Sequence, residues 1–170
     1  PMIQALRAAG MPVWGEVEFA WRYAGPCRVA AVTGSNGKTT TTTLLHHLLE
    51  QSGIPARAGC NVGYAFARLI EQDWAAGRQE DASRVFVLEI SSFQLEDTEA
   101  FRPDIALLLN ITPDHLDRYD YQLEKYADAK FRIIRQQQSG DLFLYNADNA
   151  ASVDFLQAHP ISGPELRGLK

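Results

Sequence analysis

The sequence has few cysteines and no long hydrophobic run. Its two cysteines, Cys27 and Cys60, form no Cys-x-x-Cys pattern, so we expect buried free thiols in a reducing compartment. No apolar segment approaches the ~20 residues that a membrane-spanning helix needs, and the first residues lack the basic-then-apolar pattern of a signal peptide. We therefore expect a cytoplasmic protein that does not contact a membrane.

Positive charge is also scarce. The 16 lysine and arginine residues stand against 21 aspartate and glutamate residues, which gives a net charge of -5. A surface of this sign repels nucleic acid and anionic lipid, so we expect neither as a partner. Any phosphate that the protein binds must be held by a local arrangement of residues.

Apolar segments that are typical of buried strands alternate with helical patterns. Strands are expected at 28–33, 84–90, 104–111 and 141–146, and helices at 38–51, near 65–70 and at 123–138. Near-continuous apolar strands are buried on both faces, as in parallel sheets. The alternation predicts an α/β fold, with a mostly parallel sheet and helices on both faces. The 170 residues suffice for about one domain.

A glycine loop follows the first predicted strand and precedes a helix, which is the setting of a phosphate-binding loop. Its glycines turn backbone N–H groups toward phosphate oxygens, Lys38 neutralises phosphate charge, and Thr39 offers a hydroxyl to Mg²⁺. The full Walker pattern has glycine where Val32 stands, so the alternative is a tight turn with an incidental lysine. In a fold of P-loop type, the residues expected to bind nucleotide phosphates are Gly34, Ser35, Asn36, Gly37, Lys38, Thr39 and Thr40.

Two later strand ends carry candidate metal ligands, and ligands bind at the carboxyl ends of strands in this fold. An apolar strand tolerates Glu89 only if its burial is compensated, and Mg²⁺ held with Thr39 would do so. The alternative is a surface glutamate. Asp114, His115 and Asp117 crowd together after the third predicted strand, either as metal ligands or as a helix start with an exposed histidine.

Six segments together resemble the Mur ligases of peptidoglycan synthesis. They are GSNGKTT (34–40), GCNVG (59–63), LEISSFQLE (88–96), LLNITPDHLDRY (108–119), YADAKFRI (126–133) and YNADN (145–149). The short glycine loop is the usual form in that family. The SSFQLE and DHLDRY forms resemble the members that add D-glutamate.

The resemblance implies an ATP-dependent, amide-forming ligase that joins D-glutamate to UDP-N-acetylmuramoyl-L-alanine through an acyl phosphate. It implies that Lys38 serves catalysis, that Glu89 binds a first Mg²⁺, and that His115 and Lys130 bind a second, with Lys130 as its carbamate. By position alone, Lys130 is a solvated lysine on a helix. The resemblance places four residues near the muramoyl substrate, namely Asn61, Ser91, Gln94 and Arg118.

The resemblance also implies a domain organisation. Residues 1–24 would lead in from an N-terminal domain, residues 25–170 would form part of the central ATP-binding domain, and a C-terminal ligase domain would lie outside this chain. The fragment alone is expected to be inactive, and the enzyme to be a monomer that binds small molecules. The alternatives are a ligase similar to folylpolyglutamate synthase and a non-catalytic P-loop module in which Glu89 and His115 are structural.

Overall fold

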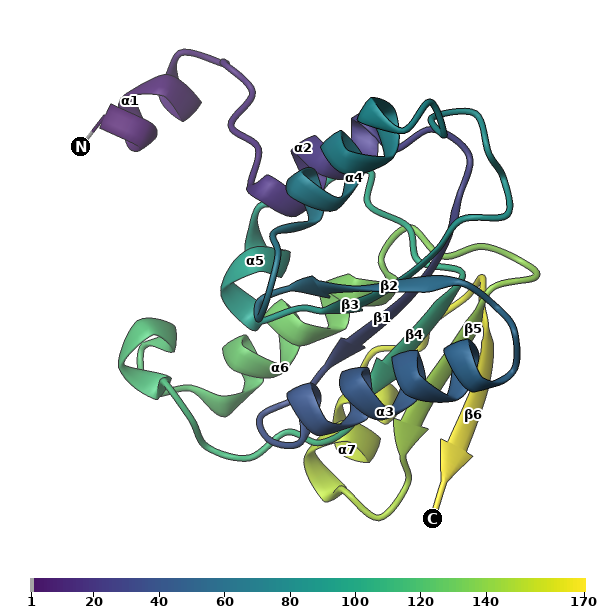
Figure 1. Ribbon diagram of the computed structural model, residues 1–170. Coiled ribbons are helices and arrows are strands. Elements are labelled where there is room, and N and C mark those ends of the chain that lie inside the picture. Colours follow the sequence, from purple (N-terminus) through teal and green to yellow (C-terminus); the bar gives the residue numbers. More distant parts are fainter. Residues whose placement is uncertain (1) are drawn as a thin grey trace.

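The computed structural model describes residues 2–170, which form a six-stranded parallel sheet with helices on both faces (Figure 1). The strand order is β2-β3-β1-β4-β5-β6, and every neighbouring pair is parallel. The predicted α/β class is therefore confirmed. The strands are β1 (Arg28–Thr33), β2 (Ala56–Cys60), β3 (Val85–Glu89), β4 (Ile105–Leu108), β5 (Leu142–Asn146) and β6 (Glu165–Leu169).

Within residues 2–170 there are seven α-helices and two short 3₁₀ turns, and α1 and α2 precede the first strand. The helices are α1 (Met2–Ala8), α2 (Glu16–Tyr23), α3 (Lys38–Gln51), α4 (Phe66–Ala75), α5 (Ser92–Glu96), α6 (Leu123–Phe131) and α7 (Ala150–Ala158). The 3₁₀ turns are η1 (Leu116–Tyr119) and η2 (Arg132–Ile134). The helix predicted at 123–138 therefore ends at Phe131 and continues only as the turn η2.

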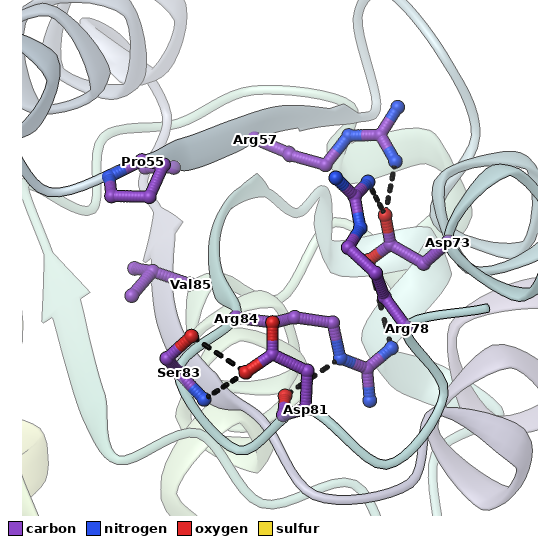
Figure 2. A pocket seen from close by; sticks show the side chains of 9 residues that line it. Pro55, Arg57, Asp73, Arg78, Asp81, Ser83, Arg84 and Val85 are labelled. Atoms are coloured by element: carbon purple, nitrogen blue, oxygen red, sulfur yellow. Dashed lines mark hydrogen bonds and ion pairs between the residues drawn. The ribbon is translucent and has the colours of Figure 1, made fainter. Parts of the chain in front are cut away.

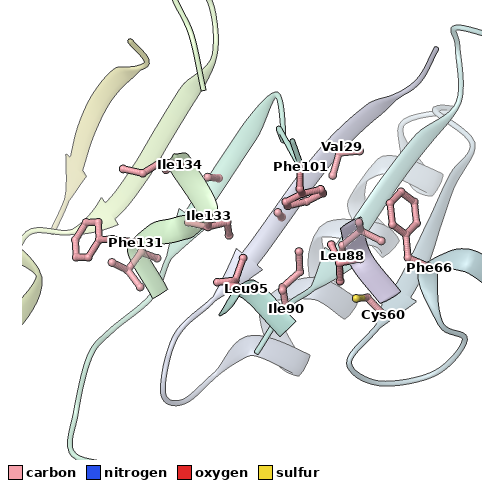
Figure 3. Close-up of a cluster of buried hydrophobic side chains, with 14 of the residues drawn as sticks. Val29, Cys60, Phe66, Leu88, Ile90, Leu95, Phe101, Phe131, Ile133 and Ile134 are labelled. Carbon is pink, nitrogen blue, oxygen red and sulfur yellow. The ribbon is translucent and has the colours of Figure 1, made fainter. Parts of the chain in front are cut away.

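Alternate strand residues face the main hydrophobic core. Val29 and Ala31 of β1 pair with Phe86 and Leu88 of β3, and all four are buried in one cluster. This alternation follows from the two-residue period of a strand. The helices on this face complete the core, as Figure 3 shows for Phe66, Leu95, Phe131 and Ile133.

Helix α3 covers the other face over β1, β2 and β3. Its bounds are those predicted, but its leucines do not all face the sheet. Leu44 and Leu48 are 54% and 52% exposed, and the buried residue of the helix is Thr42. The first turn of the helix lies at the carboxyl ends of the strands, where Thr39 contacts Glu89 at the end of β3.

Helix α2 is fastened to the loop after α5 by a buried carboxylate. Glu18 is fully buried and accepts hydrogen bonds from the backbone N–H groups of Glu99, Ala100 and Phe101, at 2.8 to 3.0 Å. It also accepts one from Arg22 Nε at 2.6 Å. A carboxylate with several donors loses little by burial, so Glu18 joins α2 to the core.

We expect Glu18→Gln to lower the free energy of unfolding by about 2 kcal/mol, because one oxygen becomes an NH₂ group that faces backbone donors. Urea unfolding followed by tryptophan fluorescence measures this, since Trp21 packs against Phe101 at 5.6 Å between ring centroids. The matched control is Glu99→Gln, whose side chain is 58% exposed; its effect should stay within about 0.5 kcal/mol. Equal effects of the two variants would contradict the role of Glu18.

Candidate functional site

The loop between β1 and α3 has the shape of an anion-binding loop. Gly34 and Gly37 have φ angles of +154° and +84°, values that L side chains rarely adopt. A Cβ on Gly34 would lie 3.1 Å from Leu109 Cβ, so the loop packs closely on the segment after β4. Gly37 is the N-cap of α3 and has no side chain to cap it, which leaves the first N–H groups of the helix for a ligand.

Lys38 and Ser35 lie within this loop. Lys38 Nζ donates to the carbonyl oxygens of Gly34, at 2.9 Å, and of Ser35, at 3.0 Å. The buried Ser35 hydroxyl donates to Thr112 O at 3.0 Å, and Asn36 N donates to Asn110 Oδ1 at 2.9 Å. Asn110 and Thr112 thus hold the loop in place, a role that the sequence analysis did not assign to them. Their position directly after a strand was the signal that could have found them.

Glu89 joins the ends of β2 and β3 to the first turn of α3. Its carboxylate, only 3% exposed, accepts hydrogen bonds from Thr39 Oγ1 at 2.7 Å and from Asn61 Nδ2 at 2.8 Å. The predicted proximity of Glu89 and Thr39 is therefore observed, and Glu89 is not a surface glutamate. A carboxylate beside a hydroxyl is a set of hard oxygen atoms that fits Mg²⁺.

Lys130 is buried against the same loop. The residue is only 1% exposed. Its Nζ donates to Gly34 O at 2.8 Å and lies 4.5 Å from the centre of the Tyr126 ring. Burial, and next the charge of Lys38, lower the pKa of Lys130 to about 7. The interpretation of Lys130 as a solvated lysine is therefore wrong.

His115 lies in the segment after β4, where it is the N-cap of the turn η1. Its backbone is left-handed, with φ of 48°, and its side chain is 59% exposed. Its Nε2 is 3.7 Å from Asp114 Oδ1, and its ring centroid is 5.3 Å from that of Phe93. Within residues 2–170, no three His, Cys, Asp or Glu side chains are grouped closely enough to hold a metal ion. A cation here would need ligands of other kinds, such as Thr39 or a phosphate.

Three of the expected substrate residues, Asn61, Ser91 and Gln94, lie at the end of β2 and the start of α5. Ser91 is the N-cap of α5, with Gln94 completing a capping box. Gln94 Nε2 also donates to Cys60 Sγ at 3.3 Å. Cys60 has φ of +92°, and burial raises the pKa of its thiol well above its usual range. Asn61 and Gln94 are thereby brought to one place, next to Glu89, by a strained residue at the end of β2.

A cavity of about 90 Å³ lies at the opposite edge of the sheet, beside Ala56 and Val85 (Figure 2). Arg57 donates to the buried Asp73 at 2.6 Å, and Arg78 pairs with the same carboxylate. The two arginines compensate the buried negative charge of Asp73 at the amino ends of β2 and β3. The cavity is therefore separate from the site around the loop.

A parallel sheet with a glycine loop between its first strand and the following helix defines a P-loop type α/β domain. The chain belongs to the Mur ligase middle domain family, which matches residues 32–163. In residues 2–170, no helix has the length and apolar composition that crossing a bilayer requires.

Three similar proteins define the relationship further. The chain is 46% identical, over 98% of its length, to the UDP-N-acetylmuramoylalanine--D-glutamate ligase of Christiangramia forsetii, and covers 35% of that protein. A solved UDP-N-acetylmuramoyl-L-alanyl-D-glutamate--2,6-diaminopimelate ligase matches 88% of this chain and 34% of its own, at 27% identity and a TM-score of 0.61. The MurF ligase of Thermotoga maritima, solved with ADP, matches 90% of this chain and 36% of its own, with a TM-score of 0.63. At 20% identity this last likeness concerns the fold alone. The chain thus spans about a third of the length of the curated relatives it matches.

Proposed function

We propose that this chain is the ATP-binding part of a ligase that joins D-glutamate to UDP-N-acetylmuramoyl-L-alanine in peptidoglycan synthesis. The observation that supports this most is the contact between the buried Glu89 carboxylate and Thr39, directly after the phosphate loop. Relatives that are over 40% identical to this chain along nearly its whole length are named as this ligase. The reaction would take place in the cytoplasm of a cell that synthesises peptidoglycan.

The chemistry has two steps. The substrate carboxylate attacks the γ-phosphorus of ATP, ADP leaves, and an acyl phosphate forms. The amine of D-glutamate then attacks the acyl carbon, loses a proton, and phosphate leaves as the amide forms. A carboxylate is a poor electrophile, so the first step supplies the leaving group for the second.

The residues of this chain would bind and align the reacting groups. The backbone N–H groups of residues 34–40 hold the phosphates, and Lys38 neutralises the charge that develops on them. Asn61, Ser91 and Gln94 lie together at the ends of β2 and β3, where they would contact the muramoyl substrate. Each of these contributions is one of position and charge, because phosphoryl transfer requires little covalent participation by the protein.

Two Mg²⁺ ions are part of the proposal. Glu89 and Thr39 would hold the first, and His115 and Lys130 the second. The ions would supply charge neutralisation between the phosphates and the attacking carboxylate. Lys130 fits this role only as a carbamate, because an ammonium group repels a cation and a carbamate is a carboxylate-like ligand.

The buried position of Lys130 supports that modification. Carbamate formation needs an uncharged amine, whose lone pair attacks CO₂ while a proton leaves. Burial of Lys130 and the neighbouring charge of Lys38 disfavour its charged form and lower its pKa to about 7. The metal would compensate the negative charge of the product.

The test of the proposed function is ATP turnover by the full-length protein. We expect ADP release to require the muramoyl substrate and amide formation to require D-glutamate as well. A ligase similar to folylpolyglutamate synthase would instead require a folate substrate, and a non-catalytic module would show no substrate-dependent turnover. Either result would overturn the proposal.

A further inference from the structure

The segments SSFQLE and DHLDRY, which are separate in the sequence, are joined at one carboxylate. Glu96, the last residue of α5, accepts hydrogen bonds from Arg118 Nη2 at 2.8 Å and from Arg118 Nε at 3.2 Å. It also accepts one from Tyr119 Oη at 2.7 Å. The guanidinium group thus binds both carboxylate oxygens, an arrangement that fixes orientation as well as distance.

Arg118 and His115 both pack against Phe93, which lies three residues before Glu96 in α5. Arg118 Cζ lies 4.6 Å from the centre of the Phe93 ring, and the His115 ring lies 5.3 Å from it. The turn η1, which carries Arg118, is flanked by left-handed residues, His115 with φ of 48° and Asp120 with φ of 53°. A short turn with such unfavourable ends needs tertiary contacts to keep its shape, and α5 supplies them.

The contacts continue to Lys130. The Tyr119 ring lies 5.2 Å from the Tyr126 ring, which lies over Lys130 Nζ. Arg132, which directly follows α6, donates from Nη1 to the backbone oxygen of Glu96 at 2.6 Å. Glu96 is therefore in contact with the turn that carries His115 and with the segment that follows Lys130.

We propose that Glu96, Arg118 and Tyr119 form a clamp that positions His115 and Lys130 at the second metal site, and that Arg118 is a positioning residue and does not contact the muramoyl substrate. The guanidinium group supports this, because two of its nitrogen atoms and its face are already engaged by Glu96 and Phe93. The inference rests on the proposed ligase function.

The test is a double-mutant cycle in the full-length protein, with Glu96→Gln, Arg118→Met and the pair. We expect each single variant to lower kcat about 10- to 100-fold, as losses of outer-shell contacts to metal ligands do, and to raise the Mg²⁺ concentration for half-maximal rate. KM for the muramoyl substrate should stay within about twofold, and the double variant should be no slower than the slower single one, since both remove one contact. Tyr119→Phe, which keeps the ring, should give a smaller effect of the same kind.

A substrate-binding Arg118 predicts a different pattern. Arg118→Met would then raise KM for the muramoyl substrate, and Glu96→Gln would leave this KM unchanged; this result overturns the clamp. The matched control is the exposed pair of Arg68 and Glu71 on α4, where Arg68→Met and Glu71→Gln should change neither parameter.

Metal binding without turnover supplies a second readout. Mn²⁺ should broaden the NMR signals of the His115 ring in the unaltered protein, and Glu96→Gln should shift this broadening to about tenfold higher Mn²⁺. Unaltered broadening in that variant contradicts the clamp. A full-length protein that binds Mn²⁺ in this way but shows no substrate-dependent turnover contradicts the proposed function instead.

Discussion

Lys38→Ala should abolish ligation by the full-length protein, with a loss of about 10³-fold or more in kcat and an intact fold. The ammonium group is the positive charge that the phosphate loop itself supplies, and in an acidic chain no general surface field replaces it. In this structure Lys38 Nζ contacts only the loop carbonyls of Gly34 and Ser35 among the residues described, so its removal leaves the core unaltered.

The measurement is substrate-dependent ADP release, with thermal unfolding as the check on the fold. Lys125→Ala is the matched control, because Lys125 is 49% exposed and pairs with Asp120. It should retain normal activity. Normal turnover by Lys38→Ala would remove the phosphate-loop interpretation.

Lys130→Ala should be almost as damaging, with a loss of at least about 100-fold in kcat, because it removes the proposed carbamate. Added bicarbonate or a small carboxylate such as acetate should restore part of the activity by occupying the vacated space as a ligand. Lys130→Met separates packing from chemistry, since it fills the space and offers no oxygen. It should fold, be as slow as Lys130→Ala, and not respond to added carboxylate. Normal activity of either variant would contradict the carbamate proposal and leave the phosphate loop unaffected.

The phosphate loop and the Glu89 contact could be predicted because each follows from a local rule. The loop residues are contiguous and stand between a strand and a helix, and Glu89 ends a strand that neighbours β1 in a parallel sheet. The strands β2 and β6 could not be predicted because their sequences, ARAGC and ELRGL, contain no β-branched or aromatic residue. Gly59 in β2 is required instead by close packing, since a Cβ there would lie 2.3 Å from Tyr64 O.

The burial of Lys130 and the pairing of Arg118 with Glu96 could not be predicted. Lys130 has the position of an ordinary surface lysine, and only the packing of α6 against the phosphate loop buries it. Arg118 and Glu96 are 22 residues apart in different elements, so no periodic pattern relates them. Both depend on how segments that are distant in the sequence pack together, which is a property of the tertiary structure.

Trapping of the acyl phosphate tests the central claim most directly. The full-length protein would be mixed with ATP and UDP-N-acetylmuramoyl-L-alanine in the absence of D-glutamate, and the mixture reduced with borohydride, which converts an acyl phosphate to an alcohol. We expect the alcohol of the muramoyl substrate to form together with ADP, and neither to form with Glu89→Gln. ADP release without any trapped product, or equal release with no muramoyl substrate present, would contradict the account.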